Sequence, residues 1–175
     1  MLFRSSIEKY QEFEQKINPK HEKIFLSLGR LAKEKSVDHL VRGFAEYLKR
    51  PDHIAARLII AGDGPERHHL ETLAKSFHLD DHIHFVGAVP IQDVPYYYNL
   101  ADLFLSASVT ETQGLTFMEA MASSTVVLCR FDENLASLIS DRKTGFFVDR
   151  PEDFAKAIAT VMQLEPAALQ KIIDQ

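Results

Sequence analysis

The sequence predicts an α/β fold: a Rossmann-like, doubly wound, mostly parallel six-stranded sheet with helices on both faces. Three observations predict it. Short apolar segments of strand length alternate with longer segments whose apolar residues recur at helical spacing. Several of the short segments are continuously apolar, which is typical of parallel strands buried on both faces. Parallel neighbours require crossover connections, and the helical segments between the strands can supply them.

Residues 1–22 precede the first predicted strand. From residue 8 the segment is dense in charge, with scattered aromatic side chains and Pro19 near its end. We expect a lead-in or linker here, and an ordered nucleotide-binding domain over residues 23–175.

The first predicted strand is KIFLSLGR (23–30), a continuous apolar run that ends in Gly29. Ser36 is the expected N-cap of a helix over 37–49, and Pro65 the expected first residue of a helix over 65–79. Further strands are expected at 56–62, 82–87, 102–108, 125–130 and 144–149, and further helices at 94–101, 115–122, 133–140, 151–164 and 166–174.

The composition excludes several classes of protein. The 175 residues are 46% hydrophobic and 26% charged, as in soluble globular proteins. Cys129 is the single cysteine, so no disulfide framework exists and a reducing, cytoplasmic setting is expected. No apolar run approaches the roughly 20 residues that span a bilayer. A net charge of −5 gives no general attraction to nucleic acid.

The polar loops that could carry chemistry each follow a predicted strand, and in a parallel sheet these loops share one edge. GRLAKEKS (29–36) resembles a phosphate-binding P-loop, but Glu34 stands where the second glycine is needed for close approach to phosphate. Arg30 and Lys35 nevertheless lie just before a helix N-terminus, which suits a diphosphate. The alternative is that both are solvated surface cations.

Other motifs favour structural roles. GDGPER (62–67) is a common turn after a strand. The eight histidines show no metal-ligand spacing, and the sequence has no D-x-D pair, so we expect no metal and no cofactor. Cys129 lies inside an apolar run, where a buried structural role is expected.

TETQGLTFME (110–119) places two glutamates around a glycine at a predicted strand-to-helix junction. The backbone of Gln113, Gly114 and Leu115 would expose N–H groups at the positive end of the helix dipole. Glu119 lies on an otherwise apolar helix, so its carboxylate is expected to be partly buried or to face a cleft. Both glutamates could accept hydrogen bonds from vicinal sugar hydroxyls. Alternatively, Glu111 complements the helix dipole and Glu119 is solvated.

These segments together resemble a known family. Glu111 and Glu119, with seven residues between them and AMASSTVVL after them, resemble the E-x7-E segment of retaining GT-B glycosyltransferases of the family-4 type (glycosyl transferases group 1). LSLGRLAKEKS, LIIAGDGPER, IHFVGAV, ADLFLSAS and TGFFVD resemble that family's segments in its order, from about residue 23 onward. The resemblance implies the C-terminal, donor-binding half of a GT-B enzyme, without the N-terminal acceptor domain.

The resemblance also implies roles for individual residues. Arg30 and Lys35 would hold the diphosphate of a nucleotide-sugar, UDP-sugar above all, and Glu119 the ribose hydroxyls. Val89 would lie near the base. Glu111 would contact the donor sugar and is the candidate catalytic residue, with no nucleophile assigned. The chain by itself is expected to bind donor and not to transfer sugar.

The same segment suggests an acceptor. Its form, T-E-T-Q-G-L-T, is similar to Gram-positive lipid glucosyltransferases that act on diacylglycerol. The expected acceptor is therefore a lipid or glycan, bound through the other domain. The full-length enzyme would then be a peripheral protein at the inner face of the membrane.

Three positions depart from the family pattern. Ser36 and Ser124 stand where glycine is usual, and Val126 stands where proline is usual. A serine in the left-handed conformation at a helix C-terminus costs roughly 1 kcal/mol. These departures, with the missing acceptor domain, leave a second hypothesis open: a non-catalytic nucleotide-binding or interaction module. A receiver-type signalling domain finds thin support in Asp63 alone.

Overall fold

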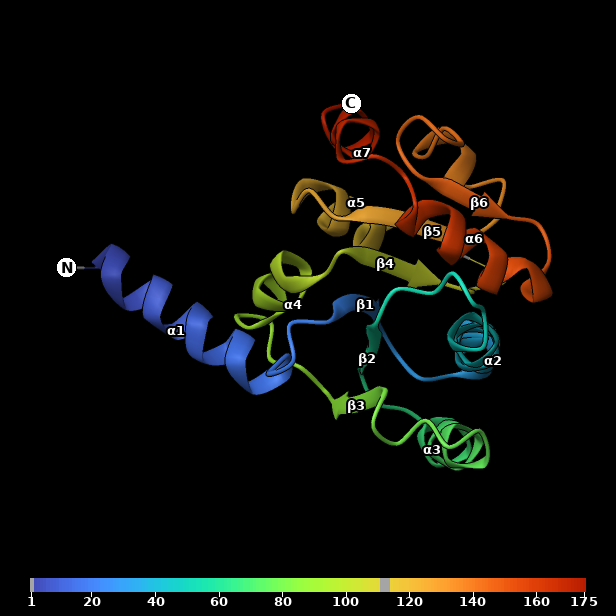
Figure 1. Cartoon of the computed structure of the whole chain (residues 1–175), viewed down its shortest axis with the longest axis horizontal. Coiled ribbons are helices and arrows are strands. Elements are labelled where there is room, and N and C mark those ends of the chain that lie inside the picture. The colour runs from blue at the N-terminus through green and yellow to red at the C-terminus, as the bar shows by residue number, and fades with distance from the viewer. Residues whose placement is uncertain (1, 111–113) are drawn as a thin grey trace.

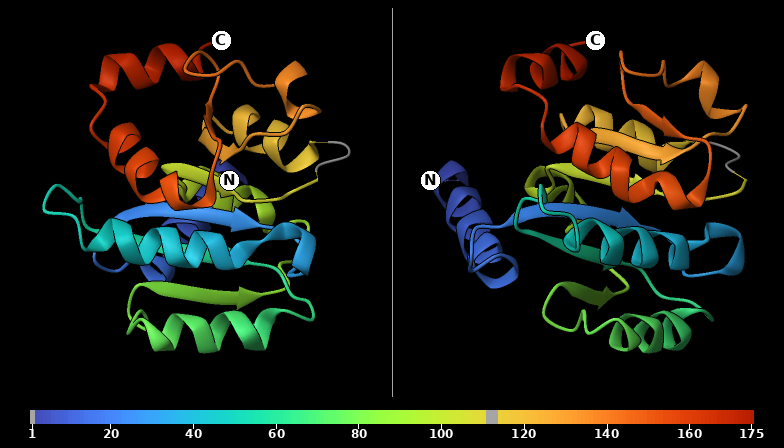
Figure 2. Two further views of the ribbon diagram at one scale, coloured as in Figure 1. Left: turned by 90° about the vertical axis from the view of Figure 1, so that its right-hand side faces the viewer. Right: turned by 45° about the vertical axis from the view of Figure 1, so that its right-hand side comes forward.

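The computed structural model describes residues 2–110 and 114–175. In this part of the chain a six-stranded, all-parallel sheet has the order β3-β2-β1-β4-β5-β6, which confirms the predicted fold class (Figure 1). The strands are β1 (Lys23–Leu28), β2 (Ala56–Ala61), β3 (Ile83–Gly87), β4 (Leu103–Ser106), β5 (Val126–Arg130) and β6 (Phe146–Val148). Figure 2 shows their arrows pointing in one direction.

Helices cover both faces of this sheet, as the sequence predicts. The α-helices are α1 (Leu2–Ile17), α2 (Val37–Leu48), α3 (Arg67–Ser76), α4 (Val94–Leu100), α5 (Leu115–Ala122), α6 (Phe154–Met162) and α7 (Pro166–Ile173). Single 3-10 turns are η1 (Lys33–Lys35), η2 (Leu135–Ser137) and η3 (Pro151–Asp153). In Figure 1, α1 and α4 lie to the left of the sheet and α2 and α3 to its right.

The core is divided by the sheet because successive strand residues point to opposite faces. On β1, Phe25 packs with Phe44 and Tyr47 of α2, whereas Ile24 and Leu26 belong to the cluster of α4 and α5. All of these side chains are at most 1% exposed. The continuous apolar runs therefore mark strands buried on both faces, as predicted.

The expectation that ordered structure begins near residue 23 is wrong, because α1 forms before it and packs on the domain. The ring of Phe13 lies 4.9 Å from that of Tyr97 on α4. The buried guanidinium of Arg57 donates to the carbonyl of Ile17 (3.1 Å) and pairs with Glu22 (3.1 Å). Aromatic and polar contacts thus anchor a segment whose high charge suggested a linker.

One predicted cap, one predicted helix start and one predicted helix differ from the structure. α2 begins at Val37 as predicted and Ser36 is its N-cap residue, but the Ser36 side chain makes no capping bond. Ser36 adopts φ 46°, and its hydroxyl donates back to the carbonyl of Lys33 (3.3 Å). Pro65 precedes α3 by two residues, because the amide of Glu66 donates to Leu31 of the neighbouring loop. The segment 133–140 forms only the single turn η2, since its end enters a tight turn closed by a hydrogen bond from Ser140 to the Thr144 hydroxyl.

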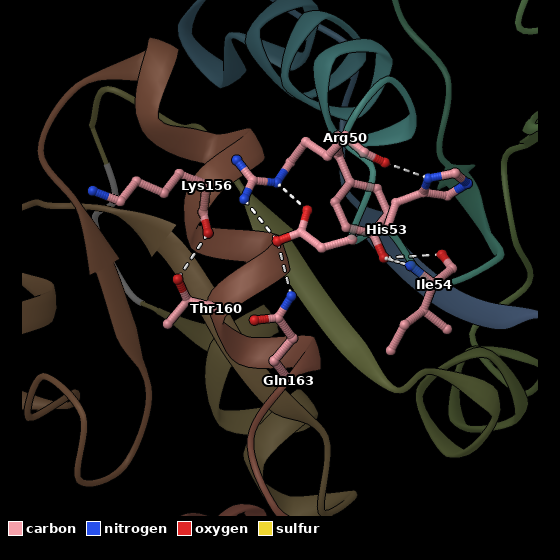
Figure 3. A network of polar contacts seen from close by, with 8 residues as sticks. Arg50, His53, Ile54, Lys156, Thr160 and Gln163 are labelled. Carbon is pink, nitrogen blue, oxygen red and sulfur yellow. Dashed lines mark hydrogen bonds and ion pairs between the residues drawn. The ribbon is translucent and has the colours of Figure 1, made fainter.

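The loop after α2 is tied to the end of α6 by a polar network (Figure 3). The carboxylate of Asp52 accepts from Arg50 (2.9 Å) and from the side-chain amide of Gln163 (2.9 Å). The bond from Arg50, followed by that from Gln163, lowers the pKa of Asp52 from 3.8 to about 2.

Ser124 is predicted to be a strained residue. It follows α5 with φ 59°, as the missing glycine suggests, and the amide of Thr125 closes the helix end on Ala120. Ser124→Gly should raise the free energy of unfolding by about 1 kcal/mol, measured by urea denaturation. Ser123→Gly is the matched control: Ser123 has φ −91°, so glycine should give no gain there. Equal effects at both positions would contradict the strain.

Asp52 is predicted to make stability depend on pH. Because folding depresses its pKa, its contribution is complete above pH 3.8 and is lost as pH falls towards 2. Asp52→Asn should lower Tm at pH 6, and at pH 3 the difference from wild type should shrink to about half. Melting curves across this pH range measure the difference in Tm. They are repeated in high salt, which screens the exposed pair of Asp52 and Arg50. A difference that does not change with pH would refute the assignment.

Candidate functional site

A cavity of about 220 Å³ opens where the order of the strands reverses, between β1 and β4. Ser27 and Leu28 at the end of β1 and Leu105 and Ser106 at the end of β4 line it. Chains leaving these two strands turn to opposite faces of the sheet, so they leave a crevice between them. In open parallel sheets, this is where ligands bind.

Two cations line this cavity. Arg30, an exposed residue, lies two residues after the end of β1, and half-buried Lys35 is the last residue of η1, just before α2. No carboxylate is found among the cavity's described lining residues. The structure therefore brings together, on the described wall of one cavity, the two cations that the sequence singled out.

The GDGP turn after β2 supports the loop that carries these cations. The amide of Leu31 donates to the carbonyl of Asp63 (2.9 Å), and the amide of Glu66 donates to the carbonyl of Leu31 (3.0 Å). Gly62 lies so close to Gly29 that a Cβ on Gly62 would sit 1.8 Å from its carbonyl oxygen. The turn thus has the structural role that the sequence predicted, and its glycines allow two backbones to touch.

The connection from β4 to α5 contacts the same loop from the other side. The amide of Val109 donates to the carbonyl of Glu34 (3.0 Å). Buried Ser108 donates to the carbonyl of Thr110 (2.8 Å). No sequence pattern indicates Ser108, because a serine after a strand has no distinctive spacing. The loop from Gly29 to Ser36 is consequently fixed from two directions.

The start of α5 forms another wall of the cavity. Gly114 is buried with φ 62°, and Leu115 and Thr116 line the cavity. The first amides of a helix have no partner within the helix, so this end can donate to an anion. Glu111 and Gln113, which the sequence also selected, lie outside the described residues.

A second cavity, of about 290 Å³, adjoins the first. It is lined by Val89 and Val94 and shares Leu28, Gly29 and Arg30 with the cavity between β1 and β4. Val89 is half-buried. The two cavities therefore meet at Arg30, with a largely apolar end at Val89 and a cationic end at Lys35.

The environment of Glu119 differs from the one expected from the sequence. It is exposed, not partly buried, although it lies one turn beyond cavity-lining Leu115 and Thr116. Its Oε2 accepts a hydrogen bond from the hydroxyl of Tyr98 (3.0 Å), a side chain only 2% exposed. Burial and the Glu119 charge raise the pKa of Tyr98 well above its ordinary value. No sequence signal indicated Tyr98, because 21 residues separate the pair.

Other chemistries find no support in the described part of the chain. No three His, Cys, Asp or Glu residues within it lie close enough to hold a metal ion. Cys129 is buried, and burial raises the pKa of its thiol, so it is not poised as a nucleophile. None of the described helices is both long and apolar enough to cross a bilayer.

The strand order and the crevice define a Rossmann-like, doubly wound domain. The sequence model of the family "Glycosyl transferases group 1" matches residues 8–175, and the chain belongs to this family.

Curated relatives agree with this family assignment. Over 140 residues the chain is 38% identical to "Alpha-monoglucosyldiacylglycerol synthase" of Acholeplasma laidlawii, a match that covers 80% of this chain and 35% of the relative. It is 37% identical over 145 residues to the enzyme of that name from Streptococcus pneumoniae, covering 83% of this chain and 32% of the relative. The chain thus spans about a third of the length of these relatives.

Solved structures share the fold. Anabaena HepE in complex with UDP-glucose gives a TM-score of 0.81 at 19% identity, covering 94% of this chain and 45% of the other. The C-terminal domain of a glycosyl transferase group 1 family protein (LpcC) from Francisella tularensis gives 0.76 at 22% identity, covering 91% of this chain and 86% of the other.

The contact between Gly62 and Gly29 gives a prediction. Gly62→Ala would force a Cβ into the Gly29 carbonyl and should cost about 1–3 kcal/mol more stability than Gly29→Ala. Gly29→Ala is the matched control, because Gly29 also has a positive φ (150° against 141°) but no atom within 4 Å of its would-be Cβ. Urea denaturation of both variants measures the difference, and equal losses would show that the loops do not need this close approach.

Proposed function

We propose that this chain is the nucleotide-sugar-binding half of a retaining glycosyltransferase, with a UDP-sugar as donor. The observation that carries the proposal is the cavity between β1 and β4, with Arg30 and Lys35 on its wall. Its position is the ligand site of doubly wound sheets, and its charge suits a diphosphate.

The diphosphate has three sources of positive potential in this arrangement. The guanidinium of Arg30 can bind two phosphate oxygens at once, and the ammonium of Lys35 acts as a point charge. The first amides of α5, beside Leu115 and Thr116, add the positive end of a helix dipole. Since cations already meet the phosphate charge and the sequence lacks a D-x-D pair, we expect donor binding to need no metal.

The nucleoside fits the second cavity. Val89 and Val94 offer an apolar wall for a planar base, and Arg30 joins that cavity to the cationic one. Glu119, one turn inside α5, would accept hydrogen bonds from the ribose hydroxyls. We therefore propose that the base lies in the second cavity and the diphosphate in the first, with the ribose hydroxyls facing Glu119, which lines neither cavity.

The donor sugar would lie at the start of α5. We propose that Glu111 contacts it as the candidate catalytic residue, and that the backbone of Gln113, Gly114 and Leu115 meets sugar and phosphate. These roles come from the family resemblance and from the position of Gly114 at the helix N-terminus. We assign no nucleophile.

The acceptor is proposed to be a lipid or glycan bound by the rest of a longer enzyme. The relatives named as monoglucosyldiacylglycerol synthases are about three times as long as the matched region, which leaves room for an acceptor domain. Such an enzyme would act in the cytoplasm, peripherally at the inner face of the membrane. This chain alone would bind donor without transferring sugar.

Ligand binding by this chain is the direct prediction. UDP at about 100 times its Kd should raise the free energy of unfolding by roughly 2.7 kcal/mol. Arg30→Ala and Lys35→Ala should each weaken UDP binding about 10- to 100-fold, because each removes a charged contact to phosphate. Isothermal titration calorimetry measures both effects.

Lys33→Ala is the matched control. Lys33 lies on the same turn as Lys35 and carries the same charge, but it is exposed and does not line the cavity. It should leave UDP affinity nearly unchanged. Equal losses for Lys33 and Lys35 would mean that only general charge matters. No binding of UDP, GDP or ADP up to millimolar concentration would refute the proposed function.

A further inference from the structure

Tyr98 and Glu119 join two helices that border the adjoining cavities. Tyr98 lies on α4 one turn beyond Val94, which lines the second cavity. Glu119 lies on α5 one turn beyond Leu115, which lines the first. Their hydrogen bond of 3.0 Å therefore connects the two helices beside the cavities.

Tyr98 is held rigidly. Its side chain is 2% exposed, and its ring packs 5.8 Å from that of Phe104 on β4. Its carbonyl oxygen accepts a hydrogen bond from the hydroxyl of buried Thr125 (2.8 Å). Phe104 in turn packs edge-on against Phe117 of α5. The Tyr98 hydroxyl is thus a fixed donor whose position is set by the core.

Glu119, by contrast, is exposed. A free glutamate side chain populates several rotamers, and ordering one of them on ligand binding costs entropy. The hydroxyl of Tyr98 donates its hydrogen bond to Oε2 of Glu119. Within the described residues no hydrogen bond is found to Oε1, so this oxygen remains available as an acceptor.

We infer that Tyr98 is a positioning residue, which holds the Glu119 carboxylate with one oxygen presented to the ribose hydroxyls of the nucleotide. This inference rests on the proposed function, because it assigns the ribose to Glu119. Tyr98 touches no ligand itself. It makes Glu119 a preorganised acceptor where an isolated, exposed glutamate would be a mobile one.

Tyr98→Phe tests the inference, since it removes the hydroxyl and keeps the buried ring. The variant should bind UDP about 5-fold more weakly, the loss expected for one hydrogen bond that orders an acceptor. Its affinity for 2′,3′-dideoxyuridine diphosphate, which lacks both ribose hydroxyls, should stay within about twofold of wild type. Calorimetric titration of the 175-residue chain with each nucleotide gives both ratios.

Two variants complete the experiment. In a Glu119→Gln background, Tyr98→Phe should cause almost no further loss of UDP affinity, because the two residues act as one unit. Tyr97→Phe is the matched control: it is the neighbouring tyrosine, also at most 9% exposed, and the described residues show no hydrogen bond to its hydroxyl. It should leave UDP affinity unchanged.

The outcomes separate the two claims. A wild-type chain that binds no UDP overturns the proposed function, and with it this inference. If wild type binds UDP but Tyr98→Phe weakens both nucleotides equally, or neither, the positioning role is overturned and the proposed function stands. A loss confined to UDP and absent in the Glu119→Gln background establishes it.

Discussion

The parallel pairing of β1 with a strand on each side is the constraint on which the rest of the structure depends. β1 pairs with β2 along its whole length, from Lys23 with Ala56 to Leu28 with Ala61, and with β4 through Phe25 and Leu26. Parallel neighbours require crossover connections, and these run through α2 on one face and reach β4 through α4 on the other. The crevice between the ends of β1 and β4 is a geometric consequence of this order.

The loop after β1 gains its shape from contacts that lie far away in the sequence. The turn after β2 holds it at Leu31, and the connection after β4 holds it at Glu34. The two contacts lie on either side of Lys33, so the backbone that carries Arg30 and Lys35 is fixed before any ligand arrives. A preorganised pair of cations binds a diphosphate without the cost of ordering the loop.

Sequence alone was sufficient for features that depend on local pattern. Continuous apolar runs gave the six strands, and the glycine at position 114 marked the start of α5. Charge and position after a strand singled out Arg30 and Lys35, and both line the cavity between β1 and β4. What the sequence could not show depends on contacts between distant segments: the packing of α1 through Phe13 and the hydroxyl of Tyr98 on Glu119. The side chain of Ser36 does not cap α2, because its left-handed backbone turns the hydroxyl back to Lys33. That backbone conformation is set by the loop and is not a preference of serine.

We propose that one nucleotide diphosphate occupies the crevice between β1 and β4. Mapping backbone amide chemical shifts of this chain during a UDP titration tests it most directly. If the nucleotide binds there, the largest changes should fall on Gly29 to Ser36, Val89, and Leu115 with Thr116. Changes centred instead on the groove of about 400 Å³ beside β6 and α6, lined by Phe146 and Lys156, would contradict it, as would the absence of any saturable change.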